Sequence, residues 1–209
     1  MKDFTRKTVD GVLAGIMIVI GCTVYLSCLN INNKIYGALL FAVALITICY
    51  KGFSLYTGKI GFMTIKNFKK EFPTLSLGLF GNVLATFIFG LMIGYCLPQV
   101  KETAITLVAS KLEQDFFEAF IKAIFCGILM YVAVALYKEK KTMLGVVFCI
   151  PVFILCGFEH SIANMGYFAI AGVIDFNSFL YIWTVILGNT VGGLLFPLLK
   201  SVFKEKDNG

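Results

Sequence analysis

Long apolar runs alternate with short polar segments along the whole chain. Several runs have the roughly 20 apolar residues that a helix needs to cross a bilayer. Lipid offers no partner to a free backbone N–H or C=O group, so such runs must fold as helices. The pattern predicts an all-α membrane protein with six transmembrane helices, at about 10–30, from Tyr36 into the 51–59 region, and at about 76–98, 116–137, 143–172 and 178–199.

Two of the predicted helices are interrupted. The second loses its regularity around Lys51–Lys59, and the fifth is broken at 157–164 by small and polar residues. The flanks of the fifth, 143–156 and 165–174, are each too short to cross alone, so we interpret them as halves of one broken helix. The alternative is a short aqueous loop between two helices. Irregular backbone is tolerated at membrane depth only where protein buries it or where it lines a water-filled cavity.

Composition supports an integral membrane protein. Hydrophobic residues make up 59% of the chain and charged residues 14%, whereas a soluble domain has about 25% charged residues. The connections are short, so we expect one transmembrane domain over 1–209. The seven cysteines show no metal spacing and no paired framework, which favours a packing role. The net charge of +6 reflects the positions of the loops and is no sign of nucleic-acid binding.

The distribution of Lys and Arg predicts the orientation of the chain. With six crossings, thirteen of these residues fall on one side and three on the other. We therefore expect both termini to be cytoplasmic, in a multi-pass protein of the inner (cytoplasmic) membrane. The thirteen are Lys2, Arg6, Lys7, Lys59, Lys66, Lys69, Lys70, Lys138, Lys140, Lys141, Lys200, Lys204 and Lys206, and the three are Lys34, Lys101 and Lys111.

The two halves of the chain share a similar pattern of interruptions and motifs. The helix after each interruption carries a Gly-Asn pair, Gly81-Asn82 in one half and Gly188-Asn189 in the other. Matching interruptions in three spans plus three indicate an inverted repeat, at about 8–100 and 111–203, whose binding site lies between the breaks near the midplane. Chance similarity is the alternative, since the echo depends on few residues.

The break in the fifth span contains the only histidine of the chain, His160. An ionisable group at this depth indicates a transport path. Burial favours the neutral imidazole and a nearby anion favours the protonated one, which suits a channel for the anion of a weak acid. The permeant then crosses the driest zone as a neutral acid or a paired ion. The alternative is a buried histidine held by hydrogen bonds. Thr57, in the opposing break, offers a hydroxyl to the anion or to the imidazole.

Other charged residues flank the predicted path. Lys111, just before the fourth span, is either a cation that concentrates anions at a vestibule or a solvated loop residue. Glu159 is expected to position the broken helix or to bond free N–H groups of its second half. Lys122 lies four residues after Glu118, and we favour a structural pair or a lysine that extends to the interface.

Amides and aromatic rings complete the predicted site. Asn82, Asn164 and Asn189 are expected to satisfy backbone groups freed at the breaks. Phe153 and Tyr56 lie close to the two breaks, where bulky rings would form hydrophobic constrictions. Packing in the core or against lipid is the alternative for both.

Several function classes lack their motifs. The chain has no P-loop, no carboxylate cluster and no metal set, so we expect no cofactor, no metal and no enzyme activity. A membrane enzyme that uses Glu159-His160 for proton chemistry would need a nucleophile or metal that the sequence does not offer. An aquaporin-like channel for a small neutral solute is the remaining alternative.

These residues resemble the formate/nitrite transporter family. The segment 157–165, Gly-Phe-Glu-His-Ser-Ile-Ala-Asn-Met, is similar to the family's fifth-span motif, and Leu55-Tyr56-Thr57-Gly58 is similar to its Leu-Phe-Thr-Gly loop. Weaker similarity covers Gly81-Asn82, 187–193 and 120–126, and Lys111 stands at the family lysine's distance before the fourth span.

The resemblance implies an aquaporin-like fold with one pore per subunit in a homopentamer. It implies that His160 and Thr57 face each other in the pore, that Lys111 lies at the vestibule, and that the permeants are small monovalent anions such as formate, nitrite and hydrosulfide, moved with or without a proton. The chain departs from the family pattern at Gly127, where Asn usually follows Cys, at Ser54 in place of Glu, and at Tyr56 in place of Phe. It therefore resembles a short, divergent member.

Overall fold

The fold of the chain is helical throughout the described residues. The computed structural model describes the backbone of residues 2–64 and 67–206, and this part contains no strand. Lys2, Lys66, Lys204 and Lys206, which entered the charge count, lie outside the residues whose side chains are described. In order, the elements are α1 (Lys2–Asn30), α2 (Lys34–Lys51), α3 (Tyr56–Lys59), the 3₁₀ turn η1 (Ile60–Phe62), α4 (Phe68–Cys96), α5 (Pro98–Leu112), α6 (Phe116–Lys140), α7 (Leu144–Leu155), α8 (Ser161–Ala171) and α9 (Phe176–Lys206).

Five helices in the described part are long and apolar enough to cross a membrane. They are Phe4–Asn30, Lys34–Lys51, Phe68–Cys96, Phe116–Lys140 and Phe176–Ser201. The fifth predicted span is divided between the short apolar helix α7 and helix α8. The helices extend beyond the predicted runs, because polar first and last turns continue the backbone hydrogen bonding into the more polar surroundings outside the apolar zone.

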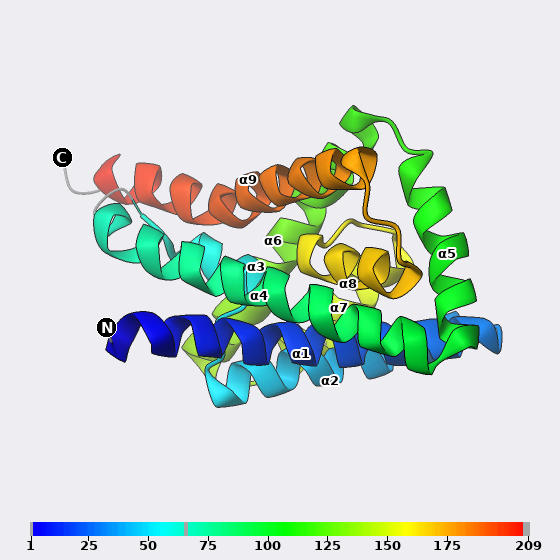
Figure 1. Ribbon diagram of the computed structural model, residues 1–209. Coiled ribbons are helices and arrows are strands. Elements are labelled where there is room, and N and C mark those ends of the chain that lie inside the picture. The colour runs from blue at the N-terminus through cyan, green and yellow to red at the C-terminus, as the bar shows by residue number, and fades with distance from the viewer. Residues whose placement is uncertain (1, 65–66, 207–209) are drawn as a thin grey trace.

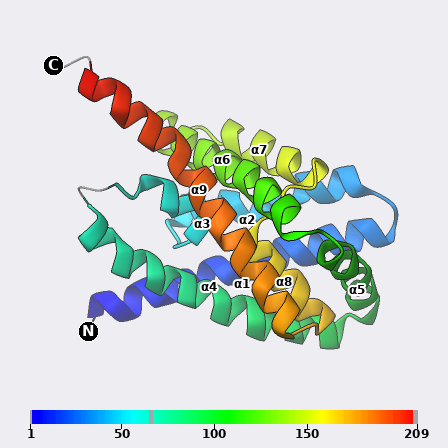
Figure 2. The ribbon, with the colours of Figure 1, turned by 90° about the horizontal axis from the view of Figure 1, so that it is seen from above.

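Most of the long helices run along one common direction. In Figure 1, α1 begins and α9 ends at the same end of the bundle, which we call the terminal end. The short helices α3 and α8 lie in the middle of the bundle, and Figure 2 shows them enclosed by the longer helices. The two breaks are thus held inside protein, where their irregular backbone can be satisfied.

Helix α5 was not expected from the sequence. The pattern suggested a loop around Lys101 and Lys111, whereas residues Pro98–Leu112 form a helix that lies across the end opposite the terminal end (Figures 1 and 2). Its one signal was Pro98 at the first helical position, where proline is favoured. Polar and charged residues are mixed among its apolar ones, so the apolar pattern did not predict it.

The break in the fifth span is shorter than predicted. The sequence placed it at 157–164, but α8 begins at Ser161, so the irregular segment is confined to 156–160. Gly157 has a φ of 70° there, a conformation that favours glycine. Ser161 and Asn164 are helical in this buried setting, where Asn189 accepts from the Ser161 backbone N–H and the Asn164 side chain donates to Glu159.

Glycines let two helix pairs approach closely, α1 with α4 and α6 with α9. A methyl carbon on Gly81 would meet the carbonyl oxygen of Thr8, and one on Gly188 would meet that of Phe120. Close approach of this kind is typical of helix packing in membranes. Gly127 is part of the same contact, since a methyl carbon there would overlap the backbone of α9. Gly127, one of the departures from the pattern that the resemblance implies, therefore has a packing reason in this chain.

Gly192→Ala is expected to destabilise the α6–α9 contact. The added methyl carbon would overlap the carbonyl oxygen of Ile124, which is backbone and cannot rotate away. We expect a loss of about 3 kcal/mol in the free energy of unfolding, typical of overpacking at its upper end. Thermal unfolding in detergent measures the loss. Val191→Ala is the matched control, because Val191 is exposed on the same helix. Equal melting temperatures for the two variants would contradict the prediction.

Candidate functional site

The two breaks meet through the side chains of Thr57 and His160. Thr57 lies in α3 and His160 immediately precedes α8, and their Oγ1 and Nε2 atoms are 2.8 Å apart. The two residues are 0% and 2% exposed. Sequence reasoning had predicted both as site residues, and the structure brings them together although they are 103 positions apart.

The second nitrogen of the imidazole identifies its tautomer. The backbone N–H of Ala163 donates to His160 Nδ1 over 3.0 Å, so His160 caps the N-terminus of α8. An atom that accepts a hydrogen bond from an amide carries no proton, so the proton of the neutral ring is on Nε2. Nε2–H then donates to the Thr57 hydroxyl oxygen, and the hydroxyl proton of Thr57 is left to donate elsewhere. A protonated ring would instead place two N–H donors against each other at Nδ1.

Asn82 on α4 holds the first break. Its Oδ1 accepts from the backbone N–H of Tyr56 (2.9 Å), and its Nδ2 donates to the carbonyl oxygens of Ser54 (2.9 Å) and Gly11 (2.8 Å). The side chain is fully buried. It satisfies two backbone groups of the break and joins them to α1.

Asn189 on α9 holds the second break with the same set of bonds. Its Oδ1 accepts from the backbone N–H of Ser161 (2.8 Å), and its Nδ2 donates to the carbonyl oxygens of Glu159 (2.8 Å) and Ala123 (2.9 Å). One amide side chain therefore bridges a break and a long helix in each half of the chain. Asn164, in contrast, binds no freed backbone group with its side chain. It donates to the Glu159 carboxylate over 2.9 Å.

Glu159 lies at the centre of a buried polar cluster. Its carboxylate accepts from Lys111 Nζ (2.6 Å), Gln114 Nε2 (3.0 Å) and Asn164 Nδ2 (2.9 Å). The predicted bond from Glu159 to N–H groups of α8 does not form, because His160 and Asn189 take those amides. Lys111 is neither free nor in a loop, since it lies in the last turn of α5 with 12% of its side chain exposed. The pair neutralises both charges beside the break.

The aromatic residues flank the breaks in different ways. The Phe153 ring, in α7, stacks on the His160 ring with 5.7 Å between centroids and 20° between planes. The Tyr56 hydroxyl lies 2.7 Å from Thr190 Oγ1. Thr190 donates to the carbonyl of Ile186, so the tyrosine is the donor of this bond. It fastens Tyr56 to α9.

Pockets lie on both sides of the buried pair. One, of about 180 Å³, opens at the end where α5 lies and is lined by Lys111, Phe153, Glu159 and His160 among others. A smaller one, of about 70 Å³, approaches from the terminal end and is lined by Leu55 and Gly58. Tyr56 does not line this second pocket, whereas Leu55, which is 1% exposed, does.

Two residues of this site were missed in the sequence. Gln114, between α5 and α6, donates to Glu159, and Leu55 lines the second pocket two residues before Thr57. No local pattern marks Gln114, but Leu55 directly precedes Tyr56-Thr57 and could have been considered with them. The predicted i,i+4 pair of Glu118 and Lys122 is confirmed at 2.6 Å. Within residues 2–64 and 67–206, no three His, Cys, Asp or Glu side chains gather as a metal site would require.

The sequence and the fold are both similar to those of known proteins. The family model described as "Formate/nitrite transporter" matches residues 2–203. The chain belongs to the formate/nitrite transporter family. Its fold is similar to that of a solved pentameric formate channel with formate bound, with a TM-score of 0.83, 23% identity and coverage of 98% of both chains. At this identity the likeness establishes the fold.

Relatives within the family are transporters by name. The chain is 31% identical over 156 residues to the uncharacterised transporter YwcJ of Bacillus subtilis (strain 168), covering 66% of this chain and 60% of YwcJ. It is 32% identical over 186 residues to formate-nitrite transporter 2 of Toxoplasma gondii (strain ATCC 50611 / Me49), covering 77% of this chain and 39% of that protein. The chain thus matches less than two thirds of the length of each of these two relatives. Family members are channels and transporters, which supports a multi-pass membrane protein that is not an enzyme.

Proposed function

We propose that this protein is a channel or proton-coupled transporter for small monovalent anions of weak acids, in the class of formate, nitrite and hydrosulfide. The contact of 2.8 Å between Thr57 and His160, buried between two pockets that open at opposite ends, carries the proposal. Family membership supports the class of permeant. The fold is taken as six transmembrane helices, with α2–α3 and α7–α8 as the two broken ones.

The hydrogen bonds at the breaks support an inverted 3+3 repeat over 8–100 and 111–203. Asn82 joins Tyr56 N–H and Ser54 C=O to α1, as Asn189 joins Ser161 N–H and Glu159 C=O to α6. The same set of three hydrogen bonds thus occurs in both halves of the chain. This is stronger support for a repeat than the two Gly-Asn pairs in the sequence. In an inverted repeat the two broken helices enter the midplane from opposite sides, and the site lies where they meet.

A path through the subunit follows from this arrangement. It would run from the pocket at Lys111 past Phe153 to His160 and Thr57, and then past Leu55 and Gly58 to the terminal end. Phe153 and Leu55 would form the two constrictions. Tyr56 was predicted for the second, but its hydroxyl is engaged by Thr190 and its neighbour Leu55 faces the pocket.

The central pair would offer hydrogen bonds without a fixed charge. The Nε2 proton of His160 polarises the Thr57 hydroxyl, whose own proton can be donated to a permeating carboxylate or nitrite oxygen. An unpaired anion in this dry zone would be costly, so we expect passage as the neutral acid or together with a proton. The Lys111–Glu159 pair adds no net charge at the mouth and would act by positioning the break.

Assembly and orientation complete the proposal. The similar solved channel is described as pentameric, and we propose a homopentamer with one path per subunit. The exposed apolar side chains along α4 and α9 would face lipid or neighbouring subunits. We propose that the protein lies in the inner (cytoplasmic) membrane. Its basic terminal end would face the cytoplasm, as the distribution of Lys and Arg predicts.

Flux in proteoliposomes tests the function. We expect the purified protein to accelerate uptake of formate, nitrite and hydrosulfide over empty liposomes, and uptake to be faster at about pH 6 than at about pH 8 because a proton accompanies the anion. Urea is the control permeant, since it is small and neutral. Urea uptake without anion uptake would favour the aquaporin-like alternative and contradict the proposal. An imposed membrane potential distinguishes a bare anion from a neutral acid.

A further inference from the structure

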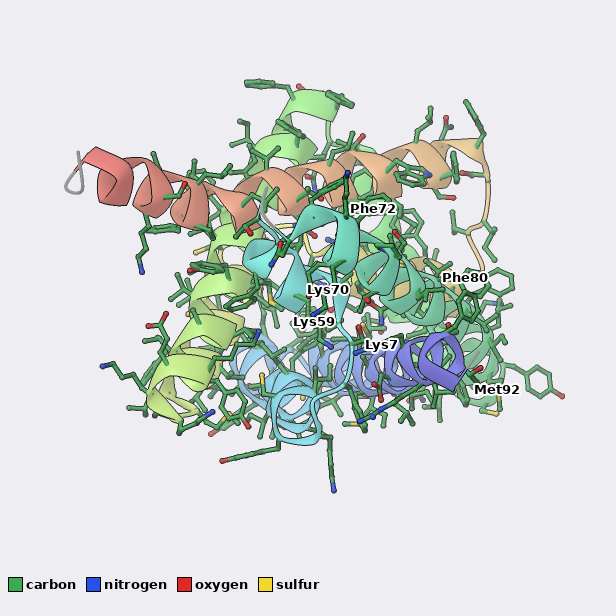
Figure 3. The ribbon with its side chains drawn as sticks, turned by 90° about the vertical axis from the view of Figure 1, so that its left-hand side faces the viewer. Lys7, Lys59, Lys70, Phe72, Phe80 and Met92 are labelled. Carbon is green, nitrogen blue, oxygen red and sulfur yellow. The ribbon has the colours of Figure 1, made fainter. Side chains whose placement is uncertain are left out.

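Two lysines occupy the junction of two pockets at the terminal end. The inner pocket, already described, ends at Leu55 and Gly58. An outer pocket of about 190 Å³ lies beside it and is lined by Lys7, Phe62, Met63, Glu71, Thr74 and Leu75. Lys59 and Lys138 line both pockets and are the residues that the two linings share. Figure 3 looks onto this end and shows Lys7 and Lys59 near its centre, away from the rim.

Within the described part of the chain these ammonium groups have no ion-pair partner, although the carboxylates of Asp10 and Glu71 act on Lys59 at longer range. Among the described side chains, no carboxylate forms a salt bridge with Lys7, Lys59 or Lys138. The Lys138 ammonium instead lies over the Phe62 ring, 3.5 Å from its centroid, and Glu71 is the one acidic residue among the described residues of the outer lining. Lys59 is partly buried and Lys138 is exposed, and both line the same two pockets. Like charges that line one pocket raise each other's energy, and a small anion between them would relieve this cost.

The opposite mouth has a different charge arrangement. There Lys111 is paired with Glu159 and Lys122 with Glu118, at 2.6 Å each. Both lysines are therefore neutralised by partners within the chain. Lys34 also lines the pocket there and forms no salt bridge with a described side chain, so the opposite mouth has one unpaired lysine. At the terminal end Lys59 and Lys138 are both without such a partner among the described side chains, and they line the pocket whose apolar residues an anion must pass to reach Thr57 and His160.

We propose that Lys59 and Lys138 form a binding site for a small monovalent anion at the inner edge of the terminal vestibule. The site rests on the proposed function and adds a step to it. An anion arriving from the terminal end exchanges part of its water for the two ammonium groups, and it then passes Leu55 toward the central pair. Lys7 raises the anion concentration in the outer pocket without contacting the inner one.

The Lys59→Gln/Lys138→Gln double variant tests the site through the concentration dependence of formate flux. Removing the two charges should raise the half-saturating formate concentration about tenfold when formate is applied at the terminal end. The flux at saturating formate should change less than about twofold, because the central pair is intact. Lys140→Gln is the matched control, since Lys140 is exposed in the same helix turn as Lys138 and lines neither pocket. If the double variant had the same half-saturating formate concentration as Lys140→Gln, the proposed binding site would be wrong. The proposed transport function would be unaffected by that result.

A measurement without flux separates the two proposals. Thr74→Cys places a thiol in the outer pocket, and its reaction with an anionic thiol reagent is compared with that of a cationic reagent of the same size. With both lysines present, the anionic reagent should react about tenfold faster, and added formate should slow it. The Lys59→Gln/Lys138→Gln changes should abolish both effects. Equal rates for the two reagents with the lysines in place would overturn the site, whether or not the protein transports formate.

Discussion

His160→Asn is expected to reduce formate flux about a hundredfold or more and to abolish its dependence on pH. Asparagine can still accept the Ala163 N–H and cap α8, because its Oδ1 takes the place of Nδ1. It cannot reach Thr57 with an N–H group as the longer imidazole does at 2.8 Å. The variant thus keeps the structural role of the side chain and removes the donor that polarises Thr57. Flux is measured in proteoliposomes at about pH 6 and about pH 8.

The comparison with His160→Ala identifies what the histidine contributes. Alanine removes the cap as well as the donor, so this variant should also lose stability, by about 1 kcal/mol. If histidine acted only as a cap, His160→Asn would transport like the parent chain and His160→Ala would not. Flux through His160→Asn with unchanged pH dependence would rule out any role of the imidazole in permeation.

Asn189→Ala is expected to lower the free energy of unfolding by about 4 kcal/mol. The change leaves the Ser161 N–H and the carbonyls of Glu159 and Ala123 without their partner in a buried setting. Each unsatisfied buried group costs about 1–3 kcal/mol, and water cannot compensate freely at this depth. The midpoint of unfolding in mixed detergent micelles measures the loss. Formate flux should fall with it, because His160 directly precedes the Ser161 amide that Asn189 holds.

A control substitution in the same helix shows whether the loss of stability comes from the bonds to the break or from replacing any asparagine of α9 by alanine. Asn177 is exposed near the start of α9, and Asn177→Ala should leave the unfolding midpoint unchanged. Asn82→Ala should cost as much as Asn189→Ala, since Asn82 makes the corresponding three bonds at the first break. A midpoint for Asn189→Ala equal to that of Asn177→Ala would show that the break does not depend on this amide.

Much of the fold could be predicted from the sequence because the bilayer imposes a strong rule. A run of about 20 apolar residues has no other stable conformation in lipid than a helix. Residues 116–137, for example, lie inside α6, and the interruption of the fifth apolar run marks the gap between α7 and α8. Helix α5 escaped this rule, because it is too polar and too short to be required by lipid.

The partners of the polar residues could be predicted only in part. Asn82 and Asn189 were expected to satisfy backbone groups, and they bind such groups, but their third bonds, to α1 and α6, could not be expected from the chain alone. Glu159 and Lys111 are 48 residues apart, and no local pattern relates them. The sequence near a helix end does not show whether a charged side chain is solvated by water or paired with another side chain.

The sequence alone therefore determined that the chain is a helical membrane protein with two interrupted apolar runs, because the length of an apolar run and its interruptions are local properties. The tertiary structure decided that Thr57 meets His160, that Ala163 N–H leaves the imidazole proton on Nε2, and that Lys111 is neutralised by Glu159. Hydrogen bonds and ion pairs depend on distances of about 3 Å. Only the packing of helices far apart in the chain can set such distances.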